Sequence, residues 1–106
     1  MNINQFLKAT EQFKMSGGHE YRKSTPRVVC ADGFNMSVQV SSNHCCTPRV
    51  NDADFYFNVE IGYPSEAEPI IMEFAEQPDN PTETVYGYVP VALVDEVIAK
   101  HGGLKA

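Results

Sequence analysis

Hydrophobic and polar residues alternate along two stretches of the chain. Every second residue is apolar over 34–40, and Phe55, Phe57, Val59 and Ile61 repeat the pattern over 54–61. Because successive side chains of a strand point to opposite faces, this period of two predicts two strands, each with one buried face. Asp32-Gly33, which precedes the first of them, is typical of a two-residue type I′ turn and predicts a hairpin over 27–41. A last strand is predicted over 85–89.

Three other segments have apolar residues at helical spacing. The first covers 2–15, with Asn2 as its cap, and 19–26 is predicted to be a polar surface loop. The second begins near Ser65, which places Glu66 and Glu68 on solvent-facing positions.

The third helix follows Pro90, which suits a first helical position because the N–H that it lacks would have no partner there. Glu96 and Lys100 are spaced as an ion pair on this helix, His101 lies in its last turn, and Gly102 is suited to end it.

The element order is therefore α-β-β-β-α-β-α. It predicts an α+β fold, with one mostly antiparallel sheet of about four strands and helices packed on one face. A chain of 106 residues suits a single domain, 1–106, in which the helical segment 1–18 is a candidate addition to a core of 27–103.

The alternation also predicts which side chains the uncovered sheet face presents. Tyrosine is favoured at contact surfaces, so tyrosines beside carboxylates on this face would suit an interface; they would equally serve as an ordinary wet face. The predicted interface residues are Tyr56, Asn58, Glu60, Tyr86, Tyr88, Asp52 and Asp54.

The net charge of −6 is unevenly distributed. No basic residue lies between Arg49 and Lys100, whereas eleven of the fourteen acidic residues fall in that interval. One interpretation is a solvated surface that keeps the protein in solution. The other is an acidic face for a basic partner protein, including one that normally binds nucleic acid. A second copy of the chain is also a candidate partner, because a basic half and an acidic half could pair.

Asn43-His44-Cys45-Cys46 is the densest cluster of reactive residues. It lacks the paired short spacing of zinc ligands and any nucleophile signature, so we predict no metal, no cofactor and no catalytic residue, with a thiol or zinc enzyme as an alternative. Three cysteines without an N-terminal signal sequence favour free thiols in a reducing cytosol.

A small-ligand or nucleotide-binding module is the other alternative. Its pocket would lie between the loops 19–27 and 42–50, and the residues that would border it are Arg22, Arg27, His44 and Arg49. The overall charge opposes binding to nucleic acid itself, and no apolar run is long enough for a membrane helix.

Four segments together carry a resemblance to a known group of proteins. They are Cys-Ala-Asp-Gly-Phe-Asn-Met-Ser-Val-Gln (30–39), His-Cys-Cys-Thr-Pro-Arg (44–49), Val-Glu-Ile-Gly-Tyr-Pro-Ser-Glu (59–66) and Val-Tyr-Gly-Tyr-Val-Pro-Val (85–91). Over 28–103 the chain resembles small uncharacterised proteins of tailed bacteriophages and prophages. The resemblance assigns no activity or functional residue. It implies a protein made in the bacterial host cytoplasm, where small acidic phage proteins often block a host protein, including restriction or CRISPR machinery.

Overall fold

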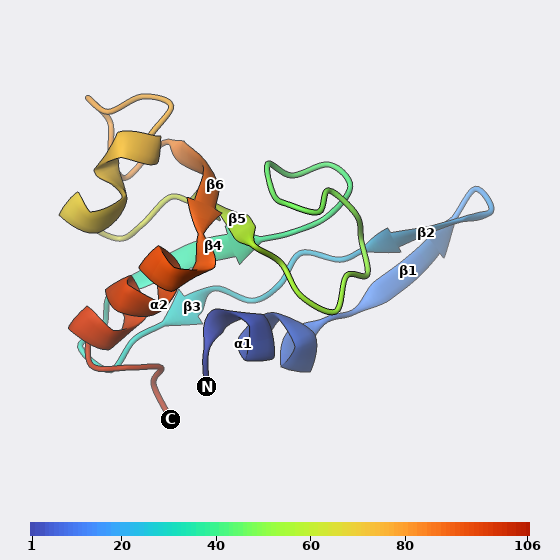
Figure 1. Cartoon of the computed structure of the whole chain (residues 1–106), viewed down its shortest axis with the longest axis horizontal. Coiled ribbons are helices and arrows are strands. Elements are labelled where there is room, and N and C mark those ends of the chain that lie inside the picture. Colours follow the sequence, from blue (N-terminus) through green and yellow to red (C-terminus); the bar gives the residue numbers. More distant parts are fainter.

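A four-stranded antiparallel sheet with helices on one face forms the body of the protein. The computed structural model describes residues 1–106, and the strand order in this sheet is β3-β4-β5-β6 (Figure 1). The elements are α1 (Ile3–Thr10), β1 (Phe13–Ser16), β2 (His19–Arg22), β3 (Val28–Val29), β4 (Asn35–Gln39), β5 (Asn58–Gly62), η1 (a 3₁₀ helix, Pro69–Phe74), β6 (Val85–Pro90) and α2 (Val91–Lys100). The α+β class and the predicted sheet are confirmed.

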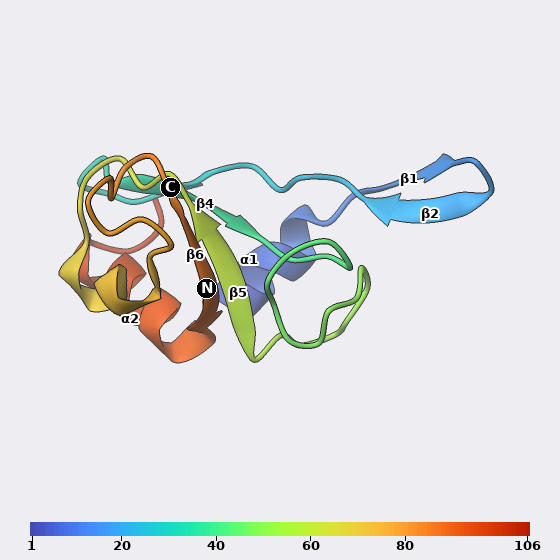
Figure 2. The same cartoon turned by 90° about the horizontal axis from the view of Figure 1, so that it is seen from above.

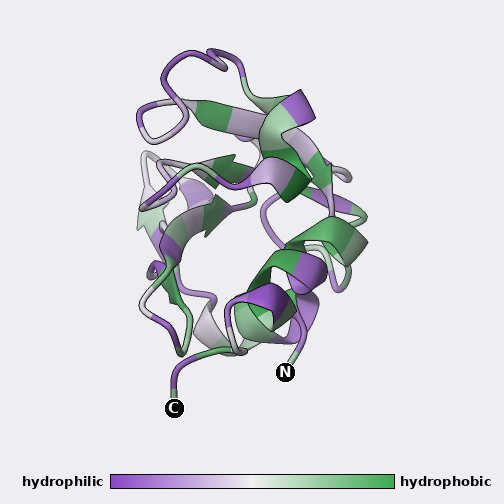
Figure 3. Cartoon of the chain, turned by 90° about the vertical axis from the view of Figure 1, so that its left-hand side faces the viewer, coloured by the Kyte–Doolittle hydropathy of each residue, from purple (hydrophilic) through white to green (hydrophobic).

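One core joins the sheet to its helical layer. The strands contribute alternate residues, such as Met36 and Val38 of β4, and the helices add residues such as Leu7 of α1, Ile71 of η1 and Val97 of α2. Figure 3 shows hydrophobic segments along the strands and α2, with polar connections around them. Neither α-helix has the length and hydrophobicity that a membrane crossing requires.

The N-terminal region differs from the predicted helix and loop. The capping box of Asn2 and Gln5 is present, but the helix ends at Thr10, and β1 and β2 pair as a second, two-stranded sheet. Gly17 and Gly18 have φ of 59° and 80°, so they form the turn between β1 and β2. This hairpin extends away from the body (Figure 2).

The predicted hairpin over 27–41 is present, but its turn is longer than predicted. Cys30 N–H donates to the Phe34 carbonyl at 2.8 Å, and Gly33 N–H donates to the Cys30 carbonyl at 2.9 Å. Gly33 has φ of 97°, whereas Asp32 does not have positive φ. The turn is therefore the three-residue type that ends on a glycine, not the type I′ turn.

Both later helices are displaced from their predicted starts. The second is the 3₁₀ helix η1, which begins at Pro69 with Glu68 as its cap. Pro90 is the last residue of β6 and the cap of α2, so the helix itself begins at Val91. Gly102, with φ of 89°, ends α2 as predicted.

For the predicted strand over 54–61, the prediction of which side chains face the core is wrong before residue 58. Phe55 and Phe57 are 50% and 64% exposed, and Tyr56 between them is buried. The Asn4 side chain on α1 bonds the Tyr56 backbone, accepting from its N–H at 2.8 Å and donating to its carbonyl at 2.9 Å. This segment is therefore held by α1, and the regular alternation begins only with β5.

The edges of the main sheet are covered by other segments. Beside β3, Lys105 N–H donates to the Val29 carbonyl at 2.9 Å. Beside β6, Tyr88 N–H donates to the Cys45 carbonyl at 3.0 Å, and Glu76 N–H donates to the Val85 carbonyl at 3.0 Å. Backbone groups that would otherwise stay open to pairing with other chains are thus satisfied within the molecule.

The corrected inner face gives a test by paired substitutions. Ile61→Ala removes a fully buried side chain and should lower the free energy of unfolding by about 2–5 kcal/mol. Phe57→Ala truncates a larger but exposed side chain and should change it by about 0.5 kcal/mol or less. Urea denaturation of both variants measures the difference; a Phe57→Ala cost as large as that of Ile61→Ala would contradict this placement.

Candidate functional site

A network of charged groups, of which Glu68 and His101 are buried, lies where α2 ends. His101 Nδ1 is 2.6 Å from Asp32 Oδ2, and His101 Nε2 is 2.8 Å from Glu68 Oε1. Lys100 Nζ donates to the other Glu68 oxygen, Oε2, at 3.0 Å. The Glu68 side chain is only 1% exposed, so its predicted solvent-facing position is wrong. Lys100 pairs with this carboxylate, whereas the predicted partner was Glu96.

Three segments that are distant in sequence position these side chains. The turn of the β3–β4 hairpin supplies Asp32, the cap of η1 supplies Glu68, and the end of α2 supplies His101. Asp32 N–H also donates to the His101 carbonyl at 3.2 Å. The Phe34 ring stacks on the imidazole, with 4.1 Å between centroids.

The surroundings shift the pKa of both buried groups toward the charged form. For His101, burial is the largest single influence and lowers the pKa, but the bonds to Glu68 and Asp32 outweigh it, so the pKa lies above 6.5. For Glu68, burial raises the pKa, but the bonds from Ile70 N–H, His101 and Lys100 outweigh it, so the pKa lies below 4.5. An ion pair between imidazolium and carboxylate is therefore favoured.

The geometry of this network suits a role in stabilising the fold better than a role in catalysis. Both ring nitrogens of His101 are bonded to carboxylates, so the imidazole has no free nitrogen to accept a proton from a substrate. No group of three or more His, Cys, Asp or Glu side chains is arranged to hold a metal ion.

The predicted interface residues do not form one open face. Tyr56 and Tyr86 are buried, and their hydroxyls donate to the carbonyls of Val50 at 2.7 Å and Pro81 at 2.6 Å, so their predicted exposure is wrong. Asn58 and Glu60 are half-buried, and Glu60 accepts from Cys45 N–H at 3.1 Å. Tyr88, Asp52 and Asp54 are exposed.

Tyr86 lies on the face opposite to the predicted one because β6 contains a bulge. Val59 pairs with Val89, but Ile61 pairs with Tyr86, so β6 has one more residue than β5 over this interval. Tyr88 takes up the irregularity with φ of 54°. A bulge reverses the alternation, which sends Tyr86 into the core and leaves Tyr88 outside.

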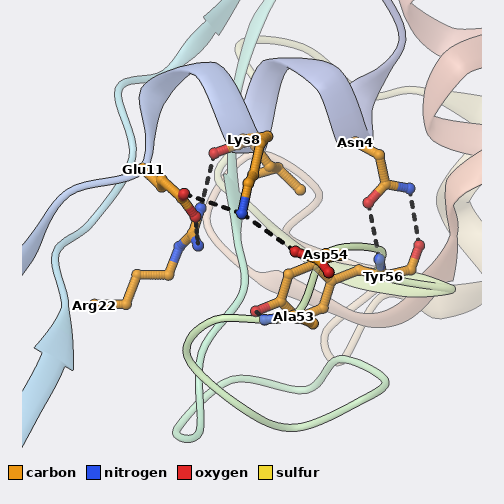
Figure 4. A pocket seen from close by; sticks show the side chains of 8 residues that line it. Asn4, Lys8, Glu11, Arg22, Ala53, Asp54 and Tyr56 are labelled. Atoms are coloured by element: carbon orange, nitrogen blue, oxygen red, sulfur yellow. Dashed lines mark hydrogen bonds and ion pairs between the residues drawn. The ribbon is translucent and has the colours of Figure 1, made fainter.

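The predicted ligand-loop residues are not gathered around one cavity. The Arg22 side chain is 2% exposed and donates to the Leu7 carbonyl at 2.9 Å; it lines a small pocket between α1 and the segment 53–56 that has no room for a water molecule (Figure 4). Arg27 lines a separate groove of about 530 Å³ beside the C-terminal residues. His44 and Arg49 bond within their own loop, to Ser41 and Ser42.

The exposed acidic residues gather beside η1. Five carboxylates without an ion-pair partner lie on η1 and its flanking connections, and we call them the acidic lobe: Glu66, Glu73, Glu76, Asp79 and Glu83. The connection from η1 to β6 forms the hydrophilic top of Figure 3. In Figure 1 the lobe and the β1–β2 hairpin lie at opposite ends of the long axis.

Comparisons with protein-family models, with curated proteins and with solved structures find no match to this chain.

The His101 network predicts a pH dependence of stability. A raised histidine pKa stabilises the fold below its unfolded value near 6.5, and this contribution is lost as pH rises through the folded value. The lowered Glu68 pKa stabilises above 4.5 and is lost as pH falls through its folded value. His101→Gln should cost about 3 kcal/mol near pH 6 and less near pH 9.

Urea denaturation over this pH range would measure the profile. The matched control is His19→Gln, since His19 is exposed on the β1–β2 hairpin and should leave the profile unchanged. Parallel profiles for wild type and His101→Gln would contradict the proposed role of the ion pair.

The three thiols should differ in reactivity. Burial raises the pKa of Cys30 and of Cys46, which reduces their thiolate fraction, whereas Cys45 is only half-buried. Iodoacetamide treatment of the folded protein should therefore label Cys45 first, as peptide mass spectrometry would show. Equal labelling of all three thiols in the native state would contradict this order. Faster labelling of the thiols in urea would not contradict it.

Proposed function

We propose that this chain is a small acidic binding protein, without enzymatic activity, that contacts a basic surface on another protein. The observation that carries the proposal is the acidic lobe, whose carboxylates are exposed and have no ion-pair partner within the chain. A surface of one charge sign accelerates association with a surface of the opposite sign and excludes partners of like charge.

The use of the other carboxylates supports this proposal. Of the eleven between Arg49 and Lys100, four have a partner in the fold: Glu60 accepts from Cys45 N–H, Glu68 lies in the His101 network, Asp95 accepts from Ile3 N–H at 2.8 Å, and Asp54 lies 3.4 Å from Lys8 Nζ. The other seven are exposed. The acidic surface is thus additional to the charges that the fold requires.

The resemblance to phage and prophage proteins suggests where the partner is found. It favours a host protein in the bacterial cytoplasm that the chain modulates or inhibits. Proteins that normally bind nucleic acid present basic surfaces, so restriction and CRISPR components are suitable targets for an acidic protein.

Charge neutralisation tests the proposal. Substituting Glu73, Glu76 and Glu83 of the acidic lobe by Gln should abolish capture of a bacterial protein that the wild type retains at about 50 mM salt and loses at about 500 mM. The measurement is affinity capture from bacterial lysate with identification by mass spectrometry.

A matched control changes the net charge by the same three units elsewhere, by Glu20→Gln on β2 and Glu96→Lys on α2, both exposed positions, and should reduce capture less. Both sets change the net charge by three, so a general charge effect would weaken capture equally. Capture that is insensitive to salt, or no captured protein at all, would refute the proposal.

A further inference from the structure

Two phenylalanines that lie side by side in space are exposed on the surface beside α1. Phe55 and Phe57 form an edge-to-face pair with 5.2 Å between ring centroids, and they are 50% and 64% exposed. Val50, 41% exposed, precedes them in the same loop. Exposed aromatic residues grouped in this way are typical of contact surfaces, because burying them removes a large apolar area from water.

The backbone around the aromatic pair is fixed in place. Tyr56 makes two bonds with the Asn4 side chain (Figure 4), and its hydroxyl donates to the Val50 carbonyl at 2.7 Å and accepts from Ala53 N–H at 3.3 Å. Phe57 N–H donates to the Thr47 carbonyl at 2.8 Å. Because Tyr56 points inward, its two neighbours must point outward. A pre-ordered anchor of this kind loses little conformational entropy on binding.

Two exposed carboxylates lie in the same loop as the aromatic pair. Asp52 and Asp54 precede it in the loop and are exposed, and only Asp54 has a basic neighbour, Lys8 at 3.4 Å. An apolar anchor with charged residues beside it resembles the centre and part of the rim of a protein interface. The complementary surface would present apolar side chains between lysines or arginines.

We infer that Phe55 and Phe57 are the apolar anchor through which the chain binds a basic amphipathic segment of its partner, with Asp52 and Asp54 contacting the basic residues beside it. The inference rests on the proposed function and locates an apolar contact apart from the acidic lobe. A second copy of the chain is a less suitable occupant, because each copy carries a net charge of −6 and two copies repel each other.

Two synthetic peptides of equal length and charge would test the inference, one alternating Lys with Leu and one alternating Lys with Ser. Isothermal titration of the wild type should show the Lys/Leu peptide binding about tenfold more tightly, because only its side chains can cover the aromatic pair. Phe55→Ser combined with Phe57→Ser should remove this preference and leave the weaker, salt-sensitive binding of both peptides. Tyr63→Ser, which changes an aromatic residue that is 54% exposed elsewhere, should retain it.

The outcomes separate the inference from the proposed function. A preference for Lys/Leu that survives the double substitution overturns the anchor and leaves the acidic-binding proposal standing. Failure of both peptides to bind overturns the two together. Circular dichroism and urea denaturation of the variants would show that they remain folded. Sedimentation velocity tests the remaining occupant. If the wild type is a dimer and the double substitution dissociates it, the aromatic pair contacts a second copy, and the assignment to a basic partner is overturned.

Discussion

The end of α2 is the point on which the arrangement of the other elements depends. Gly102 turns the chain there, with Gly102 N–H bonded to the Ala99 carbonyl and Gly103 N–H to the Ile98 carbonyl, which is the pattern of a Schellman motif. The turn lets the C-terminal residues pair beside β3, and it directs the His101 ring between Asp32 and Glu68. One residue thus joins the hairpin turn, η1 and α2.

The His101 network also includes the one basic residue next to the acidic interval. Lys100 is the one basic residue between Arg49 and Lys105, and its ammonium group is bonded to Glu68. A buried carboxylate needs such partners because desolvation of an unpaired charge is costly. Since the buried Glu68 takes this cation, the exposed carboxylates on and around η1 have none nearby along the chain.

Local patterns in the sequence predicted the elements whose determinants are local. The capping box of Asn2 with Gln5, the alternation over 34–40 and the glycine after α2 all depend on residues close in the chain, and each is present. The α+β class follows from the same signals.

The errors arose where a distant residue decides the structure. Asn4 bonds the Tyr56 backbone and reverses the inner face of that loop, while the bulge in β6 reverses the positions of Tyr86 and Tyr88. The Glu68–His101 contact, which joins residues 33 positions apart, gave no signal in the sequence, because a carboxylate near a helix start and a histidine near a helix end each have an ordinary local explanation. The surface features that suit partner binding thus follow from long-range contacts: the bonds of Asn4 expose the aromatic pair, and the His101 network withdraws the cation from the acidic lobe. When each segment is considered separately, the local pattern predicts that the two phenylalanines are buried and that Glu68 is exposed, which is the reverse of what the long-range contacts produce.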